Sequence, residues 1–161
     1  MEQLLHYIWK HRILPLHELR TTDGRLVEII DPGLHNHHSG PDFFNAKIRL
    51  DGTLWVGNVE IHERSADWFL HGHDQDPAYN NVVLHIASTI DMDVMTADGN
   101  RPPQMELHVP PHVMQNYQRL LADDRYPPCR DTVMQLPSLA VHSWMSALGA
   151  ERLSDKCDAI E

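Results

Sequence analysis

The stretch GPDFFNAKIRLDGTLWVGNVEIHERSADW, residues 40–68, decides the fold that the sequence predicts. Two runs rich in β-branched and aromatic residues, 42–50 and 53–63, flank the dipeptide Asp51-Gly52. Asp-Gly between two such runs is typical of a two-residue hairpin turn, because both turn positions must take a positive φ. We therefore expect two adjacent antiparallel strands joined by a tight turn.

The second strand of this hairpin carries polar side chains where a half-buried strand needs apolar ones. Side chains alternate between the two faces of a strand, so Asn58, Glu60 and His62 lie on one face. The apolar positions occupy the other face: Trp55, Gly57, Val59 and Ile61. An unpaired buried carboxylate is too costly to keep. The polar face is therefore expected to meet water, a partner or a metal ion.

The chain around this hairpin shows alternating helix and strand signals. Apolar residues at helical spacing predict a first helix over 2–14 that ends at Pro15. The further elements up to position 109 are a strand at 26–31, a short helix that Ser65 caps and that breaks near Gly72, a strand at 80–88, and a hairpin that joins 92–96 to 104–109 around Asp98-Gly99. This order predicts a single α/β (α+β) domain with a mixed central sheet and helices on its faces.

Two more helices are expected beyond position 110, one from Pro111 to about Leu121 and one capped by Ser138. Three prolines interrupt the segment between them. Residues 1–122 are therefore predicted to form the core domain, and residues 123–161 a linker followed by the C-terminal helix. No stop signal ends that helix before the last residue, so we expect the chain to continue in a longer protein.

Composition limits the classes of function. The 161-residue chain has a formal net charge of −10 and only three lysines. Because phosphate backbones attract clustered lysine and arginine, this charge opposes nonspecific binding of nucleic acid. No run approaches the roughly 18 apolar residues of a membrane span, and no signal-peptide pattern opens the chain. A cytoplasmic protein without a membrane segment is expected.

The order helix, three strands, helix, strand, with an aspartate entering the second strand, resembles the PD-(D/E)XK nuclease fold. The matching residues are Pro41-Asp42 and Glu60-Ile61-His62. The resemblance implies a metal-dependent, nuclease-like phosphodiesterase in which Asp42 and Glu60 hold one or two Mg²⁺ or Mn²⁺ ions and His62 positions or activates the attacking water. Cations suit this reaction because they neutralise phosphate charge and lower the pKa of water, and carboxylates are ligands that Mg²⁺ prefers.

The chain departs from that pattern at His62, where the superfamily usually has lysine. A neutral imidazole carries no fixed positive charge, so it could serve instead as a base or as a softer metal ligand. Lys47 could supply the missing charge, but strict alternation from Asp42 places it on the opposite face unless a bulge intervenes. Glu28, on the first strand, is a candidate third acidic ligand.

A second histidine-rich segment offers a different metal site. His71 and His73, in the sequence HGHD, could chelate zinc as alternating residues of a strand. Gly72 and the residues that follow predict a helix end and a loop there instead. His85, inside the apolar run VVLHIA, is expected to be a hydrogen-bonded core histidine.

Most of the chain is similar to a family of uncharacterised bacterial proteins catalogued as a domain of unknown function. The segments that carry this resemblance are LLHYIWKHRI, DPGLHNHHSGPDFFNAKI, GNVEIHERSADWFLHGHDQDPAYNNVVLHI and YPPCR. The resemblance implies no activity, so two hypotheses stand. The first is a metal-dependent nuclease that uses Asp42, Glu60 and His62 on nucleic acid. The second is a noncatalytic module that keeps the same fold to bind a partner or to hold a structural metal.

Overall fold

The computed structural model describes residues 1–13, 18–124 and 129–158. The chain divides into two units, Met1–Pro110 and Pro111–Glu161. This division falls ahead of the proline-rich segment in which the sequence places a linker. Two of the three prolines of that segment lie outside the described residues.

The second unit consists of helices over its described residues. They are α3 (Pro111–Ala122), α4 (Arg130–Val133) and α5 (Ser138–Asp158). The helix α3 begins at Pro111, as the sequence predicts. The helix α5 begins with Ser138 as its first helical residue rather than its cap, because the Val141 N–H donates to the Pro137 carbonyl. Within the described part of the chain, no helix combines the length and the apolar character that a membrane crossing needs.

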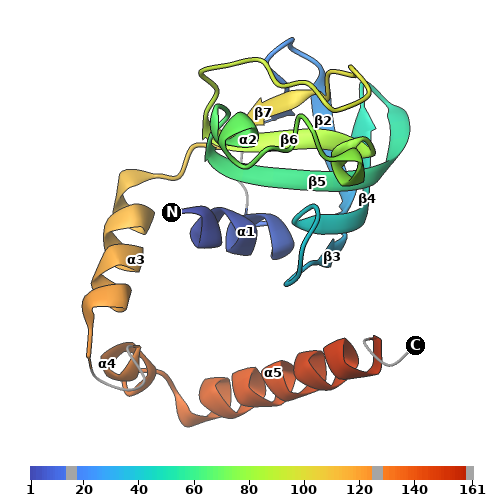
Figure 1. Cartoon of the computed structure of the whole chain (residues 1–161). Helices are drawn as coiled ribbons and strands as arrows, with labels where there is room; N and C mark the ends of the chain where they lie inside the picture. Colours follow the sequence, from blue (N-terminus) through green and yellow to red (C-terminus); the bar gives the residue numbers. More distant parts are fainter. Residues whose placement is uncertain (14–17, 125–128, 159–161) are drawn as a thin grey trace. The chain divides into compact units, whose positions relative to one another are not determined.

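The first unit is built on a seven-stranded mixed sheet with the order β1-β2-β4-β5-β6-β7, in which β3 pairs with β4 (Figure 1). The strands are β1 (Leu19–Arg20), β2 (Leu26–Asp31), β3 (Leu34–His35), β4 (Phe43–Leu50), β5 (Thr53–Arg64), β6 (Val82–Thr89) and β7 (Gln104–Glu106). The strands β2, β4 and β5 are antiparallel neighbours, whereas β6 runs parallel to β5. The expected mixed α+β domain is confirmed.

Helices lie on both sides of β5 (Figure 1): α1 (Glu2–Lys10) on one side and α2 (Asp67–Leu70) on the other. The buried residues of α1 follow the predicted helical spacing: Leu4, Leu5, Ile8 and Trp9. The indole of Trp9 donates a hydrogen bond to the Pro32 carbonyl at 3.0 Å, which ties α1 to the loop after β2. The helix ends at Lys10 rather than near position 14, because Arg12 takes a φ of 53° that leaves the helical region.

The hairpin β4–β5 confirms the prediction from Asp51-Gly52. These two residues have φ values of 47° and 82°, as a two-residue turn requires, and Leu50 pairs with Thr53. A bulge between Phe43 and Ala46 shifts the register of β4 by one residue. The bulge moves Lys47 to the face of β5 that carries Glu60. Lys47 nevertheless pairs with Val56, four residues before Glu60, which is about 13 Å along the strand.

Both faces of β5 are buried from Gly57 to His62. Its polar face does not meet water, because α2 and the chain that follows it cover that face. The cover is an apolar cluster of Trp68, Tyr79, Val82 and Val94. Any group on this face therefore needs a protein partner or a bound ion to satisfy it.

Two local predictions of the sequence are wrong. The hairpin around Asp98-Gly99 does not form, since residues 92–96 are not a strand and β7 instead pairs parallel to β6. The turn itself is present: the Thr96 N–H donates to the Asn100 carbonyl, and the Thr96 hydroxyl to Asp98. Ser65 does not cap α2. Its buried hydroxyl accepts the N–H groups of the loop at 91–92 instead.

Candidate functional site

Asp42 and Glu60, the two predicted acidic ligands, meet where β4 begins. The Asp42 N–H donates to Glu60 Oε2 at 3.0 Å, and the Ile61 N–H donates to Asp42 Oδ2 at 2.9 Å. The Asp42 carboxylate thus takes the place of a main-chain acceptor beside β5. Each carboxyl group accepts a main-chain N–H of the other strand, so the two bonds hold both groups in fixed positions.

Glu60 is buried with few charges to offset its own. Burial, together with a smaller contribution from the negative charge of Asp42, raises the pKa of Glu60 to about 9. The metal-free protein therefore keeps a proton on Glu60 at neutral pH. A bound cation would replace that proton.

His62 lies next to Glu60 in the interior, with an exposed side-chain fraction of 1 %. Its Nε2 is 3.6 Å from Glu60 Oε1, and its Nδ1 is 2.9 Å from His85 Nε2. Burial, together with the neighbouring histidines, lowers the pKa of His62 to about 2. The imidazole is neutral, so His62 does not supply the positive charge of a lysine.

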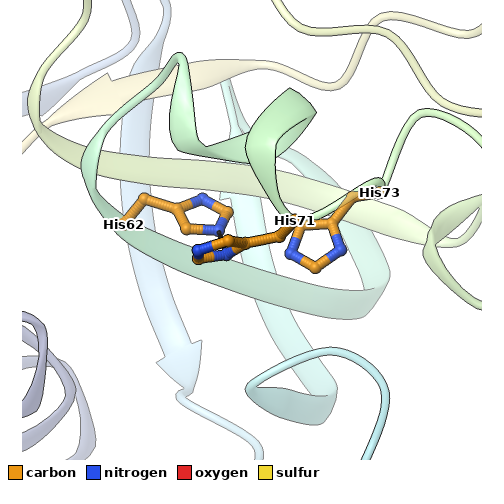
Figure 2. A group of neighbouring side chains, drawn as sticks. All are labelled: His62, His71 and His73. Carbon is orange, nitrogen blue, oxygen red and sulfur yellow. Dashed lines mark hydrogen bonds between the residues drawn. The ribbon is translucent and has the colours of Figure 1, made fainter.

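His71 and His73 join His62 from the turn after α2. The three imidazoles gather over β5 (Figure 2), and one ligand atom from each can be chosen so that all lie within 4.8 Å of one another. His71 Nδ1 is 3.2 Å from His62 Nε2, and His73 Nε2 is 3.1 Å from Glu60 Oε1. Despite that short distance, His73 Nε2 is buried without an aligned hydrogen bond. The sequence had treated this pair and the Asp42 group as alternatives, and the structure brings them together.

His85 is the hydrogen-bonded core histidine that the sequence predicts. It is fully buried on β6, and burial lowers its pKa to about 3. Its Nε2 faces His62, and its Nδ1 lies 3.3 Å from Gln104 Nε2 on β7. His85 therefore holds the His62 ring in position through the contact between His85 Nε2 and His62 Nδ1.

Glu28 does not join the other candidates. It sits on β2 opposite Arg49, and the two side chains form an exposed ion pair with a 3.4 Å contact. Arg49 is seven residues along β4 from Asp42, which corresponds to roughly 20 Å. The structure thus separates Glu28 from the acidic pair.

His6 on α1 is a site residue that sequence reasoning missed. Its Nε2 lies 3.2 Å from Asp42 Oδ2 and is buried without an aligned hydrogen bond. Burial opposes a proton on His6, but the contact with Asp42 outweighs it and raises the pKa of His6 above its ordinary value. No local pattern in the sequence places α1 beside Asp42.

A cavity of about 570 Å³ opens beside His6. Its walls include basic and aromatic side chains from α1 and from the chain after β2: His6, Tyr7, Lys10, His11, His35 and His37. Burial lowers the pKa of His35 to about 4, so that ring is neutral. Lys10 gives the cavity a fixed positive charge in a chain of net charge −10.

Comparison with known proteins identifies a family relationship. A family model described as "Protein of unknown function (DUF2851)" matches residues 2–161. No curated protein and no solved structure matches the chain. The chemistry of the site has therefore to be argued from its own residues.

Proposed function

We propose that this chain, which belongs to the family of unknown function DUF2851, is a metal-dependent phosphodiesterase of the nuclease type. The observation that carries the proposal is a pair of hydrogen bonds at the start of β4: the Glu60 carboxyl group accepts the Asp42 N–H, and the Asp42 carboxylate accepts the Ile61 N–H. It fixes two carboxyl groups side by side, next to a cavity with a cationic wall.

The topology supports the proposal. Apart from the two-residue strands β1 and β3, the elements α1, β2, β4, β5, α2 and β6 follow the order helix, three strands, helix, strand, and β6 runs parallel to β5. An aspartate precedes β4, and Glu60 lies on β5, as the resemblance to PD-(D/E)XK nucleases implies.

The residues present fit a divalent cation such as Mg²⁺ or Mn²⁺. Asp42 and Glu60 offer hard carboxylate oxygens, and the buried Nε2 atom of His73 beside Glu60 lacks an aligned partner. A cation held there would neutralise charge on a phosphodiester and lower the pKa of water. Glu60 would release its proton to the solvent as it binds.

The histidines around Asp42 and Glu60 can supply the other roles that the reaction needs. His6, with its raised pKa and its contact to Asp42, can carry the positive charge that lysine carries in the resembled fold, and it can donate a proton to the leaving oxygen. His62 stands in the position of the basic residue, but its burial suits a role in orienting Glu60. Lys47 is too far along β4 to serve.

The cavity suggests the class of substrate. Lys10 can pair with a phosphate, while Tyr7 and the imidazole rings offer surfaces on which bases stack. Stacking needs unpaired bases, so single-stranded or structured nucleic acid is the proposed substrate. The acidic net charge makes binding weak, and low salt is required to observe it.

The test measures nicking of single-stranded and hairpin nucleic acid by the full chain, at low salt, with Mn²⁺ or Mg²⁺. Asp42→Asn should reduce the cleavage rate by about 100-fold or more, and His6→Gln by about 100-fold if it transfers a proton. Glu28→Gln is the matched control, because it removes an acidic side chain from the same sheet but outside the site. Equal activity of Asp42→Asn and wild type would contradict the proposal.

A noncatalytic module with a structural metal is the second candidate. The deep burial of His62 and its contact with Trp68 of the apolar core favour it. This candidate predicts that a chelator lowers the melting temperature while no metal and no substrate gives cleavage. Metal-dependent cleavage that Asp42→Asn abolishes would exclude it.

A further inference from the structure

Three histidines from β5 and the turn after α2 can each offer a ligand atom within 4.8 Å of the others, and Glu60 Oε1 lies beside two of them. The distances are 3.2 Å between His62 Nε2 and His71 Nδ1, 3.6 Å between His62 Nε2 and Glu60 Oε1, and 3.1 Å between His73 Nε2 and Glu60 Oε1. Ligand atoms about 2.1 Å from a tetrahedral Zn²⁺ lie about 3.4 Å from one another. These three distances bracket that value, and closing the remaining spaces around an ion needs a shift of the exposed His71 side chain.

We propose that Glu60, His62, His71 and His73 bind one transition-metal dication of the Zn²⁺ class. Three imidazole nitrogens and one carboxylate oxygen form a borderline ligand set, which suits Zn²⁺ or Co²⁺ better than Mg²⁺, an ion that prefers six oxygens. This site is distinct from the cation site proposed at Asp42, but Glu60 belongs to both sites. Glu60 directs Oε2 to Asp42 and Oε1 to the histidines.

The metal-free arrangement leaves the cluster incompletely satisfied. His73 Nε2 is buried, with a side-chain exposure of 9 %, and has no aligned hydrogen bond although it points at Glu60 Oε1. A stable network of hydrogen bonds would not leave such an atom unpaired. His71 is exposed, which gives an ion a path from solvent.

The residues behind His62 can adapt to a bound ion. Gln104 Nε2 lies close to both the Met92 carbonyl, at 3.1 Å, and His85 Nδ1, at 3.3 Å, so His85 accepts at Nδ1 and donates from Nε2 to His62 Nδ1. This leaves the proton of His62 on Nε2, where an ion would bind.

Metal binding therefore reverses the direction of these hydrogen bonds. His62 would carry its proton on Nδ1 and donate to His85 Nε2, and His85 would donate from Nδ1 to the Gln104 oxygen after the amide turns over. Each imidazole stays neutral, and Glu60 alone loses a proton. The hydrogen bond from Gln104 to the Met92 carbonyl is lost. The free energy of this one neutral bond is small compared with that of a metal ion bound by four ligands.

The test uses the full chain after removal of metals with a chelator. Titration calorimetry should find one Zn²⁺ per chain, bound at least 100-fold more tightly than Mg²⁺. Co²⁺ should give the intense visible absorption of a tetrahedral complex. His71→Ala combined with His73→Gln should weaken Zn²⁺ binding about 100-fold or more, whereas His112→Ala, an exposed histidine of α3, should leave it unchanged.

Circular dichroism of each variant excludes unfolding as the cause of a loss. His71→Ala alone provides a second variant, because His71 is the exposed member of the cluster. Zn²⁺ binding that survives the double variant, or a Co²⁺ spectrum of octahedral type, would overturn the inference. The readout is metal binding, so it is independent of cleavage: a chain that binds Zn²⁺ but cleaves nothing refutes only the proposed function.

Discussion

Glu60 gives one carboxyl oxygen to each half of the polar cluster, one to Asp42 and one to His73. Its burial and the nearby negative charge keep it protonated in the absence of metal. A proton and a cation therefore compete for the same carboxyl group. This competition makes the stability of the metal-free protein depend on pH in a way that can be assigned to single residues.

We predict that the metal-free protein loses stability as the pH rises above about 6.5. The folded state holds the Glu60 proton up to about pH 9, whereas the unfolded chain releases it near 4.5, so folding takes up a proton between these values. The free energy of unfolding falls by up to about 1.4 kcal/mol for each pH unit in that window. Glu60→Gln should remove most of this decline and leave the smaller part that comes from the raised pKa of His6, as measured by urea denaturation from pH 7 to 9 in chelator.

Acid should destabilise the protein for the opposite reason. His62 and His85 have pKa values of about 2 and about 3 in the folded state, below the ordinary 6.5 of the unfolded chain. The unfolded chain therefore binds more protons as the pH falls below 6.5, and stability declines toward pH 3. Glu60→Gln should leave this acid limb in place. A variant that declined between pH 7 and 9 as steeply as the wild type would contradict the assignment of the alkaline limb to Glu60.

The sequence identified most members of the cluster but not how they group. Alternation along one strand was enough to place Glu60 and His62 on a common face. His71 and His73 could not be assigned to the same site, because a turn after a short helix has no period that fixes its direction. His6 was missed because its contact with Asp42 depends on how α1 packs against the sheet.

At the scale of elements, the sequence predicts structure that depends on local signals, but it does not predict which strands pair across a long stretch of chain. The β4–β5 hairpin follows from its own turn residues. The predicted hairpin over 92–109 failed although Asp98-Gly99 does turn, because β7 finds its partner in β6 across a longer stretch of chain. The parallel pairing of β5 with β6 likewise has no local signature, yet it sets Glu60 beside His85.

Gly57 shows how closely β5 and β6 approach each other, and it allows a test by substitution. A Cβ atom at this position would meet Val83 Cγ1 at 2.4 Å and the Asn81 carbonyl at 2.6 Å. Gly57→Ala should therefore destabilise the first unit by about 1–3 kcal/mol through overpacking. Thermal unfolding of the sheet, followed by near-UV circular dichroism, measures the change.

Gly149→Ala in α5 is the matched control, since nothing lies within 4 Å of a Cβ atom there. Alanine favours helix over glycine by about 1 kcal/mol, so this change should increase helicity. The two alanine substitutions are thus expected to have opposite signs. An unchanged midpoint in Gly57→Ala would show that the strands can separate slightly at no cost.

At the scale of the whole molecule, the two units differ in how much they bury. The sheet and every candidate ligand lie in Met1–Pro110, whereas no described residue of α3, α4 or α5 is buried. A chain of residues 1–110 should therefore unfold cooperatively, with a midpoint within a few degrees of the full chain, and bind the same number of Zn²⁺ ions. Calorimetric unfolding and a Zn²⁺ titration of the two chains test this. Failure of the shorter chain to fold would mean that the helical unit stabilises the sheet.

The two bonds that Asp42 makes beside β5 have a consequence for how related chains can diverge. Because its carboxylate serves as the acceptor for the Ile61 N–H, a descendant that no longer needed a cation would still need an oxygen at this position in order to fold. Aspartate here is thus not by itself a mark of an active protein. Asparagine would keep the acceptor and discard the charge, so among relatives that change would identify copies that inherited the architecture without its chemistry.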